Sequence, residues 1–299
     1  MNNEPRPAAV TNHAGPFQTV WHAVRLLALT GLLAGCASVA TYHLSNSVTA
    51  GMVNQDDPET VADGMPAYLL LLDGTLQQRP EDTELLLAAA RLNGAYASVF
   101  AHDKARAARI ADKALNYARK AFCLENSSLC EPNLDFQHFK KRLGSLEEDD
   151  LPVLYGYATA WAGSIQNHSD NWLSVADLPR VQAMLERVVS IDENYEYGQA
   201  HVYLGVMNSQ LPPALGGHPE VGRAHFERAI ELSGGRNLVA YVEYARSYAR
   251  LMFDRELHDR LLNTVLKADT HVRDLTLSNV IAQREAEKLL SESKEYFGE

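Results

Sequence analysis

The segment from Val188 to Leu232 most constrains the fold, because it contains two amphipathic helical patterns joined by an unusual loop. The first helix opens at Ala200 and continues through a Leu204-Gly205 pair. In the second helix, Gly222, Phe226 and Ala229 recur at steps of four and three residues. These steps place the three side chains on one helix face, where small residues admit a partner helix and the aromatic ring fills the gap. The pattern predicts an antiparallel helix pair.

The Leu-Gly pair and the small–aromatic–small spacing resemble the tetratricopeptide repeat (TPR), a helix pair of about 34 residues. In a standard repeat, the equivalents of Gly205 and Gly222 lie about twelve residues apart. Here they are seventeen apart, because Leu211-Pro-Pro-Ala-Leu-Gly-Gly217 is inserted at the corner. An apolar loop stiffened by Pro and Gly in a repeat protein is a candidate binding element.

Helical periodicity runs from Asp57 to the C-terminus, without a period-two strand pattern. The expected helices are 58–79, 81–100, 103–123, 135–143, 151–167, 177–190, 197–209, 219–233, 237–252, 254–267 and 275–297. We expect Asp57 to cap the first helix, and an alanine ridge from Ala107 to Ala121 to pack the third. The predicted fold is all-α, a right-handed array of antiparallel helix pairs forming a degenerate TPR-like superhelix over residues 57–299, with the charged final helix as a solvating cap.

The N-terminal region contains an apolar run, Leu26 to Ala34, that is too short to span a bilayer. It ends in Leu33-Ala-Gly-Cys36, which resembles a bacterial lipobox. We therefore expect residues 1–35 to be a lipoprotein signal peptide, Cys36 to be lipidated, and residues 36–56 to form a flexible tether. By resemblance to lipoprotein sorting rules, Ala37 does not look like an inner-membrane retention signal, so we expect the periplasmic face of the outer membrane. The alternative is an ordinary signal peptide with a chance cysteine.

The charge of the chain argues against nucleic-acid binding, and its cysteines predict a disulfide. Without residues 1–35 the chain has 37 acidic and 25 basic residues, a formal charge of −12, which is unsuited to binding nucleic acid. Membrane attachment would then depend on the lipid, because no later segment has eighteen consecutive apolar residues. In the oxidising periplasm, we expect Cys123 and Cys130 to form a disulfide; two independent buried thiols are the alternative.

No catalytic, phosphate-binding or metal-binding motif is recognisable, so we expect neither an enzyme nor a cofactor. The histidines are scattered, and His218 and His225, although seven apart, have no carboxylate partner that suggests a metal site. The acidic run from Glu147 to Asp150 lacks the alternating spacing of a calcium loop. We expect it to complement the positive end of the helix that follows.

Aromatic residues gather in the central third of the chain, where Trp and Tyr could form a groove for a partner or an amphipathic ligand. The candidate ligand- or partner-binding residues are Tyr157, Trp161, Trp172, Tyr197, His201, Leu211, Leu215 and Phe226. For any one aromatic residue, ordinary core packing is the competing interpretation. Trp172 and Tyr197 are expected to be the most exposed. We expect Leu211 and Leu215 to pack over the neighbouring helix pair and face Trp161 and Tyr197 across a groove or pore.

A wider pattern extends over residues 150–270. Its elements are Tyr157-Ala-Thr-Ala-Trp161, Leu178-Pro-Arg-Val181, Asn194-Tyr-Glu-Tyr-Gly198, Leu211-Pro-Pro-Ala-Leu-Gly-Gly217, Phe226-Glu-Arg-Ala229 and Ala245-Arg-Ser-Tyr-Ala249. Together with the lipobox, they resemble the TatT family, the TPR-containing T component of some tripartite ATP-independent periplasmic (TRAP) transporters. The Pro-Pro-Ala-Leu-Gly-Gly stretch is the most specific element.

The resemblance implies a non-catalytic periplasmic lipoprotein that docks a TRAP-type solute-binding protein and handles a hydrophobic or organic-acid ligand. It also makes a homotrimer an arrangement to test. The alternative is a scaffold lipoprotein whose TPR grooves assemble cell-envelope proteins. Neighbouring genes for a solute receptor and a permease would favour the transport interpretation.

Overall fold

The structure is a computed structural model that describes residues 47–298. The signal peptide, Cys36 and most of the tether expected from the sequence lie outside these residues. The helices are α2 (Pro58–Gln78), α3 (Thr83–Ala95), α4 (Lys104–Glu125), α5 (Phe136–Leu143), α6 (Leu151–Asn167), α7 (Trp172–Val175), α8 (Leu178–Ile191), α9 (Tyr195–Asn208), α10 (Pro219–Leu232), α11 (Leu238–Glu243), α12 (Arg255–Lys267), α13 (Thr276–Ser291) and α14 (Ser293–Phe297). The described chain contains no strand, so the all-α prediction is confirmed.

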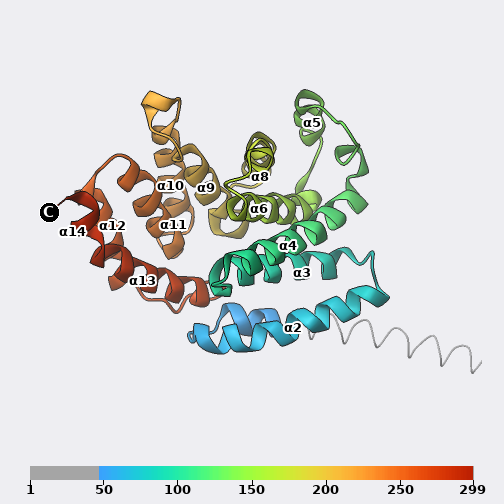
Figure 1. The fold of residues 1–299 in the computed structure, drawn as a ribbon, viewed down its shortest axis with the longest axis horizontal. Helices are drawn as coiled ribbons and strands as arrows, with labels where there is room; N and C mark the ends of the chain where they lie inside the picture. Colours follow the sequence, from blue (N-terminus) through green and yellow to red (C-terminus); the bar gives the residue numbers. More distant parts are fainter. Residues whose placement is uncertain (1–46, 299) are drawn as a thin grey trace, which may run out of the picture. The chain divides into compact units, whose positions relative to one another are not determined.

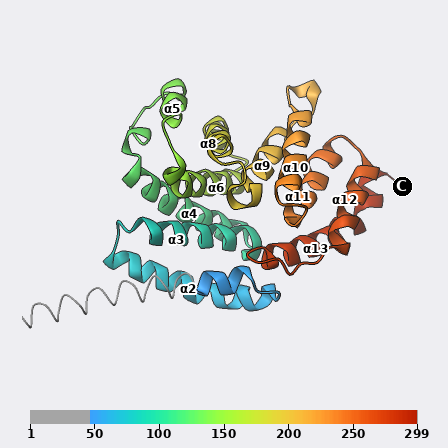
Figure 2. The same ribbon diagram turned by 180° about the vertical axis from the view of Figure 1, so that it is seen from behind.

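Residues 53–298 form one compact unit in which successive helices pack along the chain (Figures 1 and 2). The main contacts are α3 with α4, α4 with α6, α6 with α8, α8 with α9, α9 with α10, and α12 with α13. Within the described residues, no helix is both long and apolar enough to cross a membrane. The structure differs from the expected tether at its end, because residues 47–53 are helical.

Aspartate residues fix the beginnings of several helices. In each case the side chain accepts a hydrogen bond from a backbone N–H of the first turn, which has no partner inside the helix. The caps of this kind are Asp57, Asp82, Asp103, Asp135 and Asp254. The acidic run before α6 forms a short 3₁₀ turn, Glu148–Asp150, with a capping box between Glu147 and Asp150. The acidic run therefore caps its own short turn directly before α6, and no side chain of the run caps α6 itself.

Small residues set the closest helix contacts. The alanines of α4 at positions 107, 111, 114, 118 and 121 are buried, as the ridge predicted. Between α9 and α10, a Cβ at Gly205 would lie 2.7 Å from the Phe226 ring, and a Cβ at Gly222 would lie 2.8 Å from the Gly205 carbonyl oxygen. Phe226 is fully buried and stacks on Tyr244 with ring centroids 5.3 Å apart. The predicted packing of this helix pair is confirmed.

Two helices differ from the sequence expectation by ending in wider turns. The predicted helix 81–100 becomes a π-helix, η1, at Tyr96–Phe100, and the predicted helix 237–252 becomes a π-helix, η5, at Tyr244–Ala249. In η5, the Tyr244 hydroxyl donates to Glu227 at 3.1 Å and the Tyr248 hydroxyl donates to Glu220 at 2.7 Å. These contacts to carboxylates of α10 stabilise the wider turn, and they are not visible in the local sequence.

The last helices are more than the solvating cap that the sequence predicted. Helix α13 packs against α11, α12 and also α2, at the opposite end of the unit's sequence (Figure 1). The Arg284 guanidinium donates two hydrogen bonds to the Glu59 carboxylate, one of them at 2.9 Å. Ala282, Ala286 and Leu289 are buried. The helix therefore joins the two ends of residues 53–298.

The two cysteines near the end of α4 are joined. The structure contains a disulfide between Cys123 and Cys130, whose Cα atoms lie 5.7 Å apart. The closed loop contains a short 3₁₀ turn, Ser127–Leu129, with a buried Leu129. The bond therefore fixes the connection between α4 and α5.

Candidate functional site

The beginning of α9 has an unusual backbone. Glu196, Tyr197 and Gly198 have φ values of 50°, 58° and 72°, so the first turn is left-handed before the right-handed helix continues. For residues other than glycine, this conformation costs roughly 1–2 kcal/mol each. At Gly198 a Cβ would also lie 3.0 Å from the Leu232 side chain. Backbone strain of this kind concentrates at ligand clamps and other functional sites.

The strained turn forms one wall of a cleft of about 180 Å³. Four parts of the fold contribute side chains: α6, the start of α9, the start of α11, and the segment that leads into α13. The lining residues are Tyr155, Glu196, Tyr197, Gln199, Asn237, Val239, Asp274, Leu275 and Ser278. The cleft is therefore lined by two carboxylates, two amides, three hydroxyl groups and two aliphatic side chains.

The opposite wall contains a second strained residue, Asp274, with φ of 65°. Asn54 holds it by two hydrogen bonds: the Asp274 backbone N–H donates to Asn54 Oδ1 at 2.7 Å, and Asn54 Nδ2 donates to Asp274 Oδ1 at 3.2 Å. In the described chain, five residues other than glycine have positive φ, and three of them line this cleft. That concentration makes the cleft the first candidate for a functional site.

Arg91 of α3 supports the strained turn. Its guanidinium lies 3.2 Å from the Glu196 carboxylate and 3.5 Å from the Tyr195 hydroxyl. Burial raises the pKa of Tyr155 well above the usual value, and Tyr203 and Glu196 add to the shift. Burial also raises the pKa of Tyr195. Both phenols therefore stay neutral at physiological pH and act as hydrogen-bonding groups rather than charges.

Among the residues predicted from the sequence, Tyr197 lies in this cleft. Its hydroxyl donates to the Arg273 carbonyl at 3.4 Å. Tyr157 and Trp161 stack on each other with centroids 5.1 Å apart, and Tyr157 also contacts Phe122 of α4. Tyr157 is buried and Trp161 is half-buried. This aromatic stack packs α6 on α4.

His201 and Phe226 are buried, so neither can touch a partner as the groove hypothesis required. His201 Nδ1 lies 2.8 Å from His225 Nδ1, and one ring must donate its proton to the other. His201 Nε2 lies 3.9 Å from the Glu193 carboxylate. Burial lowers the pKa of His201 to about 4, and the neighbouring His225 contributes to the shift. The pair is a neutral contact inside the α9–α10 packing.

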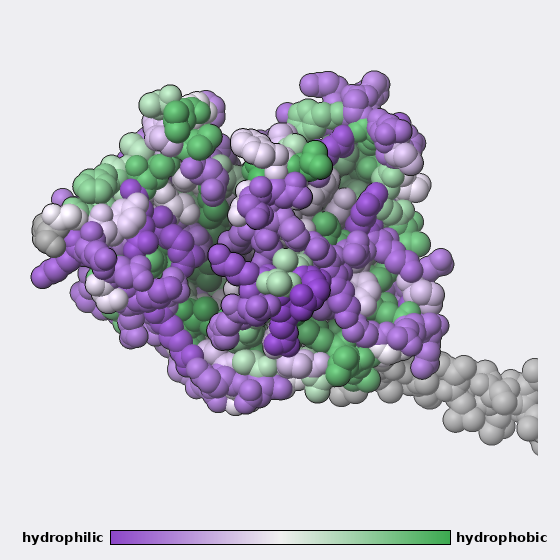
Figure 3. Space-filling model, in the orientation of Figure 1, coloured by the Kyte–Doolittle hydropathy of each residue, from purple (hydrophilic) through white to green (hydrophobic). Residues whose placement is uncertain are grey.

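Leu211 and Leu215 do not pack over a neighbouring helix pair, which corrects the expectation from the sequence. They are 49% and 69% exposed, on a loop that projects beyond α9 and α10 in both ribbon views (Figures 1 and 2). Figure 3 shows strongly apolar colouring on this projection. The loop folds on itself: Pro213–Leu215 forms a 3₁₀ turn, and a Cβ at Gly217 would lie 1.8 Å from the Leu211 carbonyl oxygen. Its shape therefore depends on glycine.

Trp172 is exposed, as expected, and it lies in the short helix α7, between the helices predicted at 151–167 and 177–190. It is 85% exposed, and the adjacent Leu173 is 82% exposed. Exposed apolar segments in the second half of the described chain thus include α7, the 211–215 loop and Met252-Phe253.

Comparison with known proteins identifies the family. The sequence profile described as TRAP transporter T-component matches residues 54–297, nearly all of the described chain. The chain belongs to this family. A comparison with curated proteins gave no match. The family is a transporter component rather than an enzyme family, and membership supports a TRAP-associated role in the cell envelope.

Sequence reasoning missed most of the cleft of this T component. The motif Asn194-Tyr-Glu-Tyr-Gly198 belongs to the family pattern. Its polar residues predict only a connection before a helix, and not the left-handed turn that lines the cleft. The signal that could have found the site is Gly198, because glycine two residues after a corner often marks a left-handed backbone. Asn237 and Asp274 gave no local signal.

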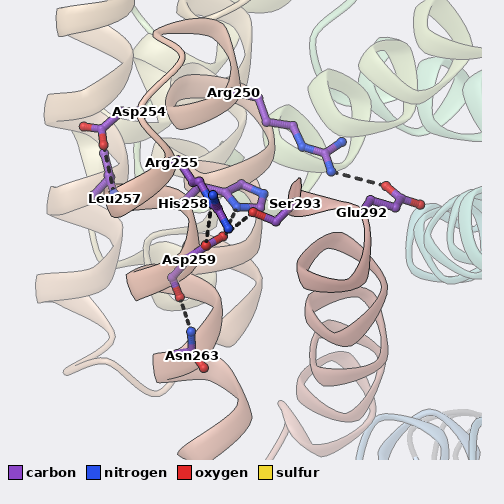
Figure 4. Close-up of polar contacts among 9 residues, drawn as sticks. All are labelled: Arg250, Asp254, Arg255, Leu257, His258, Asp259, Asn263, Glu292 and Ser293. Atoms are coloured by element: carbon purple, nitrogen blue, oxygen red, sulfur yellow. Dashed lines mark hydrogen bonds and ion pairs between the residues drawn. The ribbon is translucent and has the colours of Figure 1, made fainter. Parts of the chain in front are cut away.

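A second polar cluster of the T component lies between α12 and α14 (Figure 4). Asp259 Oδ1 lies 2.8 Å from His258 Nδ1 and accepts from the Ser293 hydroxyl at 2.7 Å. The carboxylate therefore stands between the serine and the histidine, whereas nucleophilic catalysis needs the histidine next to the serine. His258 is fully buried. The cluster attaches α14 to α12, and Arg250 adds a contact to Glu292 at 3.2 Å.

Proposed function

We propose that this T component docks a periplasmic solute-binding protein through the projecting loop at residues 211–215. The exposure of Leu211 and Leu215 carries the proposal. A loop kept rigid by two prolines and a close glycine contact presents its apolar side chains without a large loss of conformational entropy on binding. Exposed apolar residues on a rigid projection are typical of protein interaction sites.

We infer that the protein is attached to the periplasmic face of the outer membrane through a lipid at Cys36, and that its helix pairs form a right-handed TPR-like array. Support for the array comes from the Gly205, Gly222 and Phe226 contacts between α9 and α10. Support for the anchor comes from the lipobox. A homotrimer is compatible with the proposal and is tested by the molar mass in solution.

A hydrophobic or organic-acid ligand is part of the transport role that the family resemblance implies. The cleft between α6 and α13 is a poor site for an organic acid, because two carboxylates lie on its walls. Like charges at close range are unfavourable unless a cation intervenes. In this proposal, an acidic solute stays with the solute-binding protein and the T component contacts that protein.

The second candidate function is a scaffold for cell-envelope proteins. The observation that favours it is the separate apolar surface at Trp172 and Leu173, which would allow a second partner. A scaffold would bind several envelope proteins, whereas a transport component would select one solute-binding protein.

The test exchanges the two loop leucines for serine, in the variant Leu211→Ser/Leu215→Ser. Helicity should be unchanged, and the affinity for a TRAP-type solute-binding protein from the same organism should fall at least tenfold. The matched control is Leu70→Ser/Leu71→Ser, which changes two leucines of α2 that are 72% and 53% exposed. Equal affinities of the loop variant and the control would refute docking at the loop. Loss of helicity would mean that the loop leucines stabilise the fold.

A further inference from the structure

We propose that the cleft between α6, α9, α11 and α13 binds a small organic cation, a ligand that carries a protonated amine. This inference goes beyond the docking role and does not depend on it. It rests on the hydrogen-bonding groups that the cleft offers, on a buried amide in its wall, and on its size.

Three donors of the lining are already used within the protein. The Tyr197 hydroxyl donates to the Arg273 carbonyl, the Ser278 hydroxyl donates to the Leu275 carbonyl at 2.9 Å, and Asn237 Nδ2 donates to Gln199 Oε1 at 2.8 Å. The oxygen lone pairs of both hydroxyls remain, and the carboxylates of Glu196 and Asp274 only accept. Gln199 Nε2 and the Tyr155 hydroxyl are donors of the lining as well, but the acceptors outnumber them, so a ligand with several N–H donors complements the lining.

Asn237 supplies an independent indication. Its side chain is only 1% exposed, yet it is one of the residues that line the cleft. Since Nδ2 donates to Gln199, Oδ1 is the polar atom left for a ligand. Asn237 Oδ1 is open to the cleft, because it is not one of the buried polar atoms that lack a partner, and there it can accept a hydrogen bond from a ligand N–H.

The charges nearby are compatible with a cation. Arg91 pairs with one oxygen of Glu196 at 3.2 Å. Arg273 approaches Asp274 at 3.6 Å, but its side chain is 92% exposed and solvent screens it. The chain as a whole has a net charge of −11, which attracts cations and repels acids.

The size and composition of the cleft restrict the ligand class. A volume of about 180 Å³ is below the 300–1,000 Å³ that is common for drug-sized ligands. A long acyl chain does not fit. Within residues 47–298, no group of three or more His, Cys, Asp and Glu side chains is arranged to hold a metal ion. The ligand of the proposal is a small amine, held between Glu196 and Asp274 with the tyrosine rings beside it.

The experiment is a calorimetric titration of the wild-type protein with two matched series. One series is ethanolamine, ethylene glycol and glycolate; the other is putrescine, 1,4-butanediol and succinate. In at least one series the amine should bind at least tenfold more tightly than its matched alcohol and acid. If neither amine binds, or if the alcohol or the acid binds as tightly, the proposal is overturned.

Variants then locate the site. Glu196→Gln and Asp274→Asn keep the side-chain shape and remove one charge, and each should weaken amine binding about tenfold or more. Glu256→Gln on α12, where the side chain is 91% exposed, is the control and should bind like wild type. Unchanged affinity in both cleft variants would place the amine elsewhere and overturn the proposal. The ligand series on wild type decides the ligand class even if a cleft variant fails to fold, and the loop variant tests docking separately.

Discussion

Gly205 of α9 lies directly against the ring of Phe226 on α10, so closely that a Cβ at position 205 would stand 2.7 Å from the ring carbons. We predict that Gly205→Ala destabilises the protein by about 1–3 kcal/mol, the range typical of overpacked cores. The gain in helix propensity from alanine, about 1 kcal/mol, offsets only part of this cost. Urea denaturation followed by circular dichroism measures the change. Gly163→Ala in α6, where a Cβ would meet nothing within 4 Å, is the control and should not lose stability.

The His201–His225 contact predicts a loss of stability in acid. The pKa of His201 is about 4 in the folded protein, below its ordinary value of 6.5, so the unfolded chain binds more protons between these values. Stability is therefore full above pH 6.5 and falls as the pH decreases to 4, by roughly 2–3 kcal/mol. The charged groups that face the pair are Glu193, Arg228 and Glu186.

Denaturation series at pH 7, 6 and 5 test this prediction. The variant His201→Gln has no proton to gain and should show a shallower fall than wild type, whatever its stability at pH 7. Parallel curves for the two proteins would mean that other groups cause the pH dependence.

Local sequence signals were sufficient for most helices. The predicted helix at 151–167 has the observed bounds. The helix predicted at 254–267 begins one residue too early, and the one predicted at 103–123 begins one residue too early and ends two residues too early. The bounds are predictable because helix caps are local. Asp254, for example, accepts a hydrogen bond from the backbone N–H of Leu257, only three residues later, so the sequence alone indicates where the helix begins.

The cleft could not be predicted in the same way, because it depends on contacts between distant parts of the chain. Asp274 is held in a left-handed conformation by Asn54, which is 220 residues away. Glu196 and Tyr197 adopt positive φ against the preference of their residue types, and Arg91 of α3 supports that turn. Several of the aromatic residues that the sequence suggested for a groove, such as Tyr157 and Phe226, fill the core instead. Their spacing along the helix is the same for a buried ring and for a ring that lines a groove, so the sequence could not separate the two.

The disulfide should stabilise the connection between α4 and α5. Replacing Cys123 and Cys130 with serine is predicted to lower the free energy of unfolding by about 2–3 kcal/mol, the value expected for a short closed loop. The comparison is between the oxidised wild type and the double variant in urea. Mass spectrometry of unreduced peptides should show Cys123 joined to Cys130; two alkylatable thiols in freshly prepared periplasmic protein would contradict this.

The lipobox predicts that Cys36 carries the membrane anchor. Labelling with a radioactive or clickable fatty acid should mark the wild-type protein, and Cys36→Ala should lose both the label and the membrane fractionation. The reason is that a lipid at this position supplies the hydrophobic attachment that no described helix provides. An unlabelled wild type that still sediments with membranes would show a different mode of attachment.

The docking proposal is tested most directly by amide hydrogen exchange of the T component with and without its solute-binding protein. The projecting loop lies within residues 209–218, and the backbone N–H groups of this segment that are not already bonded within α9 should become protected when the partner binds. Helix α2 at residues 70–75 serves as the reference and should exchange at the same rate in both states. Protection confined to another surface, with the 209–218 segment unchanged in the complex, would contradict the proposal.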